Sequence, residues 1–291
     1  MRNVYPTGLE EGPRSSALSL LVFYASSKRQ KLTKIGLYVE KRVGHDIRHS
    51  RFGHVKVSLE IICALLKECH QNTQLVSRSV MRTLILVLKC SDSRVALQAT
   101  DTFVLFNRYY NHESVVDDEL KRLYLALVTE FHAESTKPVH LSRQDHRFDS
   151  LHRPRLSGLK ALESLCDKDL FLKRPDLGEF IDLMMAAFLY NINDSSLATS
   201  DIAPCESSQA NSAAESDLTK ISMQCISKIF AGASANNMAL ILAAFYRLPL
   251  LTQTMRNQLD MDQPAVCSKT LYEDCRLVQD RISILDHCEY L

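Results

Sequence analysis

Apolar residues recur every three or four positions along most of this chain, and this spacing limits what it can fold into. Six stretches show the pattern most clearly: Val55/Leu59/Ile62/Leu66/Cys69, Val76/Val80/Leu84/Val87, Leu120/Leu123/Leu127/Phe131, Leu177/Ile181/Met184/Phe188, Leu218/Ile221/Cys225/Ile229 and Leu271/Cys275/Val278/Ile282/Leu285. Residues spaced in this way lie on one side of an α-helix, so each stretch predicts an amphipathic helix with one buried face. Glycine and proline are scarce, with 8 of each in 291 residues, whereas strand-rich folds need frequent turn signals. The sequence therefore predicts an all-α fold of about ten or eleven helices.

We expect these helices to form a single domain over residues 1–291, built as a HEAT/armadillo-like helical-repeat solenoid. In a solenoid of this kind, antiparallel helix pairs stack on one another in chain order. No repeat of fixed period is visible, so the prediction rests on the number and length of the helices. A compact helical bundle is the alternative architecture.

Two polar segments interrupt the helical pattern. Residues 133–155 are rich in histidine and arginine and contain two prolines, which predicts a long loop between helices. Residues 192–217 hold seven serines and five acids but no lysine or arginine, which predicts a disordered acidic, serine-rich surface insertion. Charge is therefore segregated along the chain, with basic residues early and acidic residues late.

Positive charge is concentrated in residues 26–56, although the whole chain has a net charge of only +1. This basic segment holds nine cations, namely Lys28, Arg29, Lys31, Lys34, Lys41, Arg42, Arg48, Arg51 and Lys56. Its only acids are Glu40 and Asp46, so nine cations less two acids leave an excess of +7. A local excess of this size on a nearly neutral chain indicates a surface that binds anions.

The middle of the basic segment has the pattern of a helix with two faces. On a helical wheel, Leu32, Ile35, Val39 and Val43 fall within about 80° and form the predicted buried face. The flank beside it carries Lys31, Lys34, Tyr38, Lys41 and Arg42. Solvated helix faces usually place acids four residues from their cations, and we expect this flank to lack such partners.

Signatures of enzymes are missing from the sequence. It contains no phosphate-binding G-x-x-x-x-G-K, no G-x-G-x-x-G, no G-x-S-x-G and no H-E-x-x-H. Cys63, Cys69 and His70 lie close together in sequence, but Cys63 continues an apolar stripe and is better explained as a core residue than as a metal ligand. We therefore expect a protein that is not an enzyme and that has no cofactor and no metal.

The spacing of the cysteines and the length of the apolar segments indicate the cellular compartment of the protein and its relation to membranes. Nine cysteines show no short-spaced framework and no signal peptide precedes them, so we expect reduced thiols in the cytosol. The longest apolar runs are only nine residues long, Ala17–Ala25 and Met238–Tyr246, whereas a spanning helix needs roughly 18. Any membrane association is therefore expected to be peripheral.

The anion that best suits this basic segment is a phospholipid surface. Nucleic-acid recognition usually adds arginine, stacking aromatics and several patches along a groove, and this chain has no tryptophan. Each lysine or arginine near an anionic membrane contributes about 1 kcal/mol, which gives weak, reversible attachment. The candidate lipid-binding residues are Lys28, Arg29, Lys31, Lys34, Lys41, Arg42, Arg48 and Arg51. A helical-repeat module that binds nucleic acid through the same residues is the alternative function.

The first seventy residues resemble a known family. The pattern FYA, KLxKIGxYxEKR, D and R, from Phe23 to about His70, resembles the N-terminal region of the EFR-three (Rolling blackout) family. A YPTG motif before it and ATDTFVLFNRYYN after it extend the likeness to about Phe131. The resemblance covers only the N-terminal portion of the family's much longer chains, and it is closest to the fungal members.

The resemblance carries its own expectations. It implies a long α-helical rod bound peripherally to the cytoplasmic face of the plasma membrane. It also implies a partner, the type III phosphatidylinositol 4-kinase, recruited through a tetratricopeptide-type adaptor. The eight candidate cations match the family's basic patch, so residues 1–70 are expected to face the membrane. Nucleic acid is an unlikely partner on this view.

Overall fold

The structure is a computed structural model, and it describes residues 4–6, 12–90, 92–110, 117–137, 149–167, 171, 177–198, 208–232 and 237–244. The chain divides into two compact units, Met1–Phe245 and Tyr246–Leu291, and all of the described residues belong to the first. The predicted single domain over residues 1–291 therefore stays a prediction for the second unit. The predicted helix over 271–285 also lies outside the described residues.

The described residues are helical almost throughout. In chain order the helices are α1 (Ser15–Ser27), η2 (Arg29–Lys31), α2 (Leu32–Arg48), α3 (Phe52–Glu68), η3 (His70–Asn72), α4 (Gln74–Leu88), α5 (Ser93–Tyr109), α6 (Asp118–Ser135), α7 (Asp149–Cys166), α9 (Gly178–Ala198) and α10 (Ser208–Gly232). No strand occurs in the described part of the chain. The predicted all-α class is confirmed.

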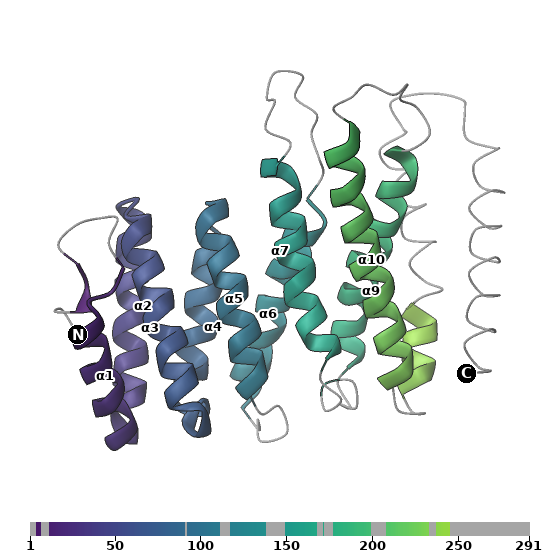
Figure 1. Cartoon of the computed structure of the whole chain (residues 1–291). Coiled ribbons are helices and arrows are strands. Elements are labelled where there is room, and N and C mark those ends of the chain that lie inside the picture. The colour runs from purple at the N-terminus through teal and green to yellow at the C-terminus, as the bar shows by residue number, and fades with distance from the viewer. Residues whose placement is uncertain are drawn as a thin grey trace. The chain divides into compact units, whose positions relative to one another are not determined.

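The helices of the first unit are arranged in two layers (Figure 1). One layer contains α2, α4, α6 and α9, each packed against the next, and the other contains α1, α3, α5, α7 and α10. Consecutive helices also pack across the layers, as α2 with α3, α4 with α5, α6 with α7 and α9 with α10. Each helix thus contacts mainly the helices one or two positions away along the chain, which is typical of a helical-repeat solenoid and not of a bundle around one central core.

Most residues of the predicted apolar stripes that lie within the described residues are buried between helices, whereas Leu120 and Leu123 of α6 and Ile221 of α10 are only half-buried. In α3, the side chains of Val55, Leu59 and Leu66 are at most 1% exposed, and the stripes of α4 and α9 are buried in the same way. Aromatic rings fill the space between α5 and α6, where the ring centroids of Phe103 and Phe131 are 4.7 Å apart. Burial of this apolar surface is the main contribution to the stability of the array.

Side-chain and backbone caps set where several helices begin and end. Asp92 accepts hydrogen bonds from two backbone N–H groups at the start of α5, and Asp117 accepts one from Glu119 at the start of α6. Helix α2 ends in a Schellman motif, in which Arg51 N donates to Asp46 O and Ser50 N donates to Ile47 O. Ser50 has a left-handed φ of 54°, a conformation that lets the chain reverse directly into α3.

One glycine lets two helices approach unusually closely. A Cβ atom at Gly158 of α7 would lie 2.6 Å from Ser135 N and 2.7 Å from Phe131 O, both in the backbone of α6. Backbone atoms cannot move aside as a flexible side chain can. The crossing of α6 and α7 therefore requires glycine at this position.

Two predictions about polar segments need correction. The predicted loop 133–155 is shorter, because α6 continues to Ser135 and α7 already begins at Asp149. Some of the polar residues at its ends are buried and have partners. Arg155, for example, is 2% exposed and donates to Asn191 Oδ1 at 3.1 Å. Residues 138–148 lie outside the described residues.

The predicted insertion 192–217 is likewise narrower than expected. Helix α9 runs on to Ala198 and α10 begins at Ser208, so only residues 199–207 of this segment lie outside the described residues. The sequence SQANSAAESD at the start of α10 contains three alanines and a glutamate, which have good helix propensity. Low hydrophobicity and an acidic charge therefore did not exclude helix here.

Candidate functional site

Helix α2 separates its core residues from its cations as predicted. Leu32, Ile35, Val39 and Val43 are all buried. Lys34, Lys41 and Arg48 are exposed and lie seven residues apart, a spacing that drifts by only about 20° around an ideal helix. At a rise of 1.5 Å per residue these three cations form a row about 21 Å long.

Apart from Arg42, the other candidate cations lie at the two ends of α2. Lys28 and Arg29 are exposed between α1 and α2, Arg51 is exposed just before α3, and Lys31 is half-buried. Within the described residues no ion pair involves any of these side chains or those of the α2 row. We call the six exposed ones the cationic surface: Lys28, Arg29, Lys34, Lys41, Arg48 and Arg51.

Both acids of the basic segment point away from solvent. The Glu40 side chain is 18% exposed and lies toward α4, where its carboxylate is 3.7 Å from the Arg82 guanidinium. The Asp46 side chain is completely buried. Residues 26–56 therefore expose six of their nine lysines and arginines and turn both carboxylates inward, so the positive charge of these six is not offset from within the segment.

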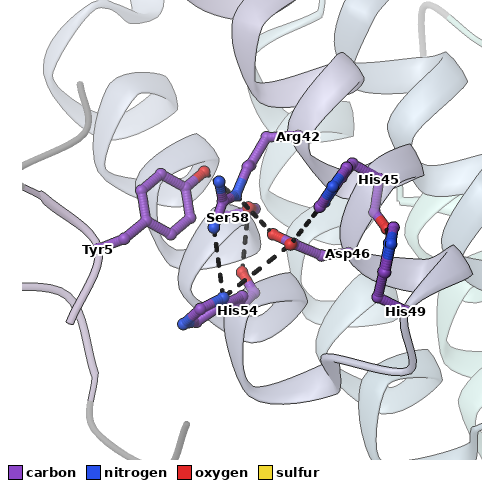
Figure 2. Close-up of polar contacts among 7 residues, drawn as sticks. All are labelled: Tyr5, Arg42, His45, Asp46, His49, His54 and Ser58. Carbon is purple, nitrogen blue, oxygen red and sulfur yellow. Dashed lines mark hydrogen bonds and ion pairs between the residues drawn. The ribbon is translucent and has the colours of Figure 1, made fainter. Parts of the chain in front are cut away.

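Arg42 is an exception among the predicted site residues. Its Nε donates to Asp46 Oδ2 at 2.8 Å, and its Nη2 is 3.4 Å from His54 Nδ1 (Figure 2). The guanidinium also lies 5.0 Å from the centre of the Tyr5 ring. The expectation that the flank lacks acids four residues away was thus wrong for Arg42, since Asp46 is its i+4 neighbour. Arg42 thus differs from the cationic surface in that its guanidinium already has partners within the fold.

Several further groups close around the buried carboxylate. His45 Nδ1 is 3.3 Å from Asp46 Oδ1, and His54 Nδ1 is 3.9 Å from the same oxygen. The hydroxyl of Tyr5 is 2.8 Å from Ser58 Oγ, and burial raises the pKa of that hydroxyl to about 12. This buried network fixes residues near the N-terminus against α2 and α3. The Arg42–Asp46 spacing could have revealed part of it, but the YPTG motif gave no indication that Tyr5 contacts these residues.

Candidate metal ligands do not come together in the described part of the chain. No group of three histidine, cysteine or carboxylate residues there could hold a metal ion. Cys63 lies 3.4 Å from Thr102 Oγ1 on α5, and burial raises the pKa of its thiol, so the metal-binding thiolate is disfavoured. No described helix is long and apolar enough to cross a membrane.

Paired helices in two layers, with each pair packed against the next, define an armadillo-type helical-repeat protein. A family model for the armadillo repeat of EFR3 matches residues 18–247, which is most of the chain. The chain therefore belongs to the EFR3 family, as the N-terminal resemblance predicted.

Individual relatives agree with this assignment. The protein efr-3 of Neurospora crassa is 33% identical over 159 residues, which cover 54% of this chain and 14% of the relative. The protein EFR3 of Yarrowia lipolytica is 34% identical over 109 residues, 37% of this chain and 13% of the relative. The crystal structure of Efr3 matches with a TM-score of 0.54 and 18% identity, covering 86% of this chain and 50% of that one, which confirms the solenoid fold. The matched part of this chain thus spans only about a seventh of these curated relatives.

Proposed function

We propose that this chain is a peripheral scaffold on the cytoplasmic face of the plasma membrane and is not an enzyme. In this proposal the cationic surface binds anionic phospholipids, and the attached chain helps to recruit a phosphatidylinositol 4-kinase complex. The observation that supports lipid binding is the separation of charge in the basic segment, with exposed cations and inward-facing Glu40 and Asp46. Membership of the EFR3 family supports the scaffold role.

The expected strength of attachment follows from the number of exposed cations. Each one near an anionic membrane contributes about 1 kcal/mol. If three of the six contact lipid at once, the sum of about 3 kcal/mol corresponds to a roughly 150-fold preference for anionic over neutral membranes. Attachment of this strength is reversible and salt-dependent, because exposed charges are screened at physiological ionic strength.

The partner in the kinase complex is proposed from the family resemblance alone, as a tetratricopeptide-type adaptor. The alternative, a nucleic-acid-binding module, is less favoured by the structure. The cationic surface lies within residues 28–51, and the basic residues on and just after the neighbouring helix α4, Arg78, Arg82 and Lys89, are ion-paired with Asp117, Glu119 and Glu130. The same cations would nevertheless attract any polyanion, so RNA belongs in the test.

Sedimentation with lipid vesicles tests the proposal directly. The site variant carries Lys34→Glu, Lys41→Glu and Arg48→Glu, which reverse the row on α2. The control variant carries Arg108→Glu, Lys160→Glu and Lys220→Glu, three exposed cations on α5, α7 and α10, so that both variants change the net charge equally.

Wild type and control should sediment with vesicles that contain phosphatidylserine or phosphatidylinositol 4-phosphate, and should stay in solution with pure phosphatidylcholine. The site variant should bind anionic vesicles at least about a hundredfold more weakly. Equal losses in the two variants would mean that total charge, and not the cationic surface, drives binding. Tighter binding of wild type to RNA than to any vesicle would instead support the nucleic-acid function.

A further inference from the structure

Helix α1 presents apolar side chains to solvent although it packs against α3. Leu20 and Phe23 are 70% and 71% exposed, and Tyr24 is 41% exposed. The spacing i, i+3, i+4 places the three on one side of the helix. A different side of α1, with Leu21 and Ala25, is buried. We call Leu20, Phe23 and Tyr24 the apolar ridge.

The apolar ridge is continuous with the cationic surface. Lys28 follows the end of α1, and its Nζ lies 5.6 Å from the centre of the Tyr24 ring. Arg29 comes next, and Lys34 lies in the first turn of α2. Helix α1 itself contains no charged residue, and serines flank the ridge. Exposed leucine, phenylalanine and tyrosine side chains therefore stand directly beside a group of unpaired lysines and arginines.

We propose that the apolar ridge of α1 inserts into the interfacial region of an anionic bilayer while the adjacent cations contact the lipid headgroups. This inference rests on the proposed membrane function and names a second group of residues for it. A combination of bulky apolar side chains with lysine and arginine at their edge is what an interfacial membrane-binding helix requires. The phenol of Tyr24, with an apolar ring and a polar hydroxyl, suits the same boundary.

The size of the ridge favours a lipid surface over a protein partner. Stable protein interfaces bury about 800 Å² on each side, which three side chains on a 13-residue helix do not provide. At about 20 Å the helix is also too short to cross a hydrocarbon core of about 30 Å. The ridge is thus suited to shallow insertion, with α1 lying in the plane of the membrane.

Shallow insertion would change how binding depends on salt. Attraction between the cations and the headgroups weakens as ionic strength rises, whereas burial of apolar side chains does not. The ridge would therefore retain part of the binding under conditions that screen the cations. It would also supply the second contribution that a weak electrostatic attachment needs.

The chain provides a clean reporter for this insertion because it contains no tryptophan. Leu20→Trp introduces a single indole on the ridge, and Leu97→Trp introduces one at a 43% exposed site on α5 as the control. On addition of anionic vesicles, the emission of Leu20→Trp should shift to shorter wavelength and be quenched by lipids brominated near the top of the acyl chain. The control should show neither change.

Substitution tests whether insertion contributes to affinity. Phe23→Ser should weaken binding to anionic vesicles about tenfold, and the loss should persist at high salt. Leu97→Ser is the matched control and should bind like wild type. Because Phe23 is 71% exposed, thermal unfolding of Phe23→Ser should match that of wild type, which excludes misfolding as the cause.

The outcomes separate this inference from the proposed function. If reversal of the α2 row abolishes binding while Phe23→Ser binds normally and Leu20→Trp does not shift, the membrane function stands and insertion is refuted. If wild type ignores anionic vesicles, the proposed function itself fails. A Leu20→Trp emission that is already blue-shifted without vesicles would mean that protein covers the ridge, and that result also overturns the insertion.

Discussion

Lys41 and Arg42 are adjacent cations, and the structure predicts very different losses of stability when their charges are reversed. Lys41 is exposed and has no ion pair among the described residues, whereas the Arg42 side chain is 29% exposed and hydrogen-bonds to the buried Asp46. Lys41→Glu and Arg42→Glu change the net charge by the same amount. Any difference in stability between them therefore reports what each side chain does in the fold.

The expected difference can be worked from the contacts. Removing one partner of a buried ion pair costs about 3–5 kcal/mol, and the partial exposure of Arg42 favours the lower end, about 3 kcal/mol. A glutamate at this position adds repulsion from the Asp46 carboxylate, about 1 kcal/mol if it turns toward solvent. Lys41→Glu should change the free energy of unfolding by about 0.5 kcal/mol or less. The two variants should thus differ by about 3–4 kcal/mol.

Thermal unfolding followed by circular dichroism at 222 nm measures this difference. For a unit of this size, the predicted gap corresponds to a Tm about 10 °C lower for Arg42→Glu than for Lys41→Glu. The double variant Arg42→Gln/Asp46→Asn should be more stable than Arg42→Gln alone or Asp46→Asn alone, because it leaves no unpaired buried charge. Equal Tm values for Lys41→Glu and Arg42→Glu would refute the assignment of Arg42 to the fold.

Two further predictions concern the array itself. Gly158→Ala should lower the free energy of unfolding by about 2 kcal/mol, because a Cβ would meet the backbone of α6 at 2.6 Å. Gly44→Ala should raise the free energy of unfolding by about 0.5–1 kcal/mol, because alanine has the higher helix propensity and the nearest atom to its Cβ would be 3.9 Å away. Chemical denaturation measures both variants, and equal changes in the free energy of unfolding for Gly158→Ala and Gly44→Ala would contradict the close crossing of α6 and α7. The hydrogen bond from Glu119 N, followed by the Arg78 guanidinium, lowers the pKa of Asp117 below its usual 3.8. A carboxyl pKa that is lower in the folded than in the unfolded state stabilises the fold at pH values above the unfolded-state pKa, and this stabilisation is lost as the pH falls through the folded-state pKa. The Tm of Asp117→Asn should therefore approach that of wild type below about pH 4. A Tm difference that is independent of pH would show that the charge of Asp117 contributes nothing.

Much of the fold was predictable because helical periodicity reports burial directly. The stripe Val55, Leu59 and Ile62 on α3 and the stripe on α9 were identified from spacing alone, and both are buried. The layering followed from the number of helices and from the short links between them. The structure adds the register, such as the close contact of Gly158 with α6, because register depends on the shapes of both surfaces.

The predictions that differ from the structure are those in which polar residues were taken to indicate a loop or a solvated helix face. Arg155 lies in the predicted loop 133–155, yet it is buried against Asn191. Arg42 lies in the predicted cationic flank, yet it is paired with Asp46. In both cases a charged side chain is satisfied by a specific partner on the same or another helix. Periodicity of apolar residues carries no information about such partners, because it describes which face is buried and not what a buried polar group contacts.

The two parts of the proposed membrane surface would act over different distances, and this sets an order of events. At physiological ionic strength charges are felt over about 8 Å, so the α2 row would attract the chain to an anionic membrane before any contact forms. The ridge contributes only after Leu20 and Phe23 leave water, which requires α1 to touch the bilayer. Reversal of the row should therefore slow association, whereas Phe23→Ser should speed dissociation. Stopped-flow mixing with anionic vesicles resolves the two rates, and a slower association of Phe23→Ser with unchanged dissociation would contradict this order.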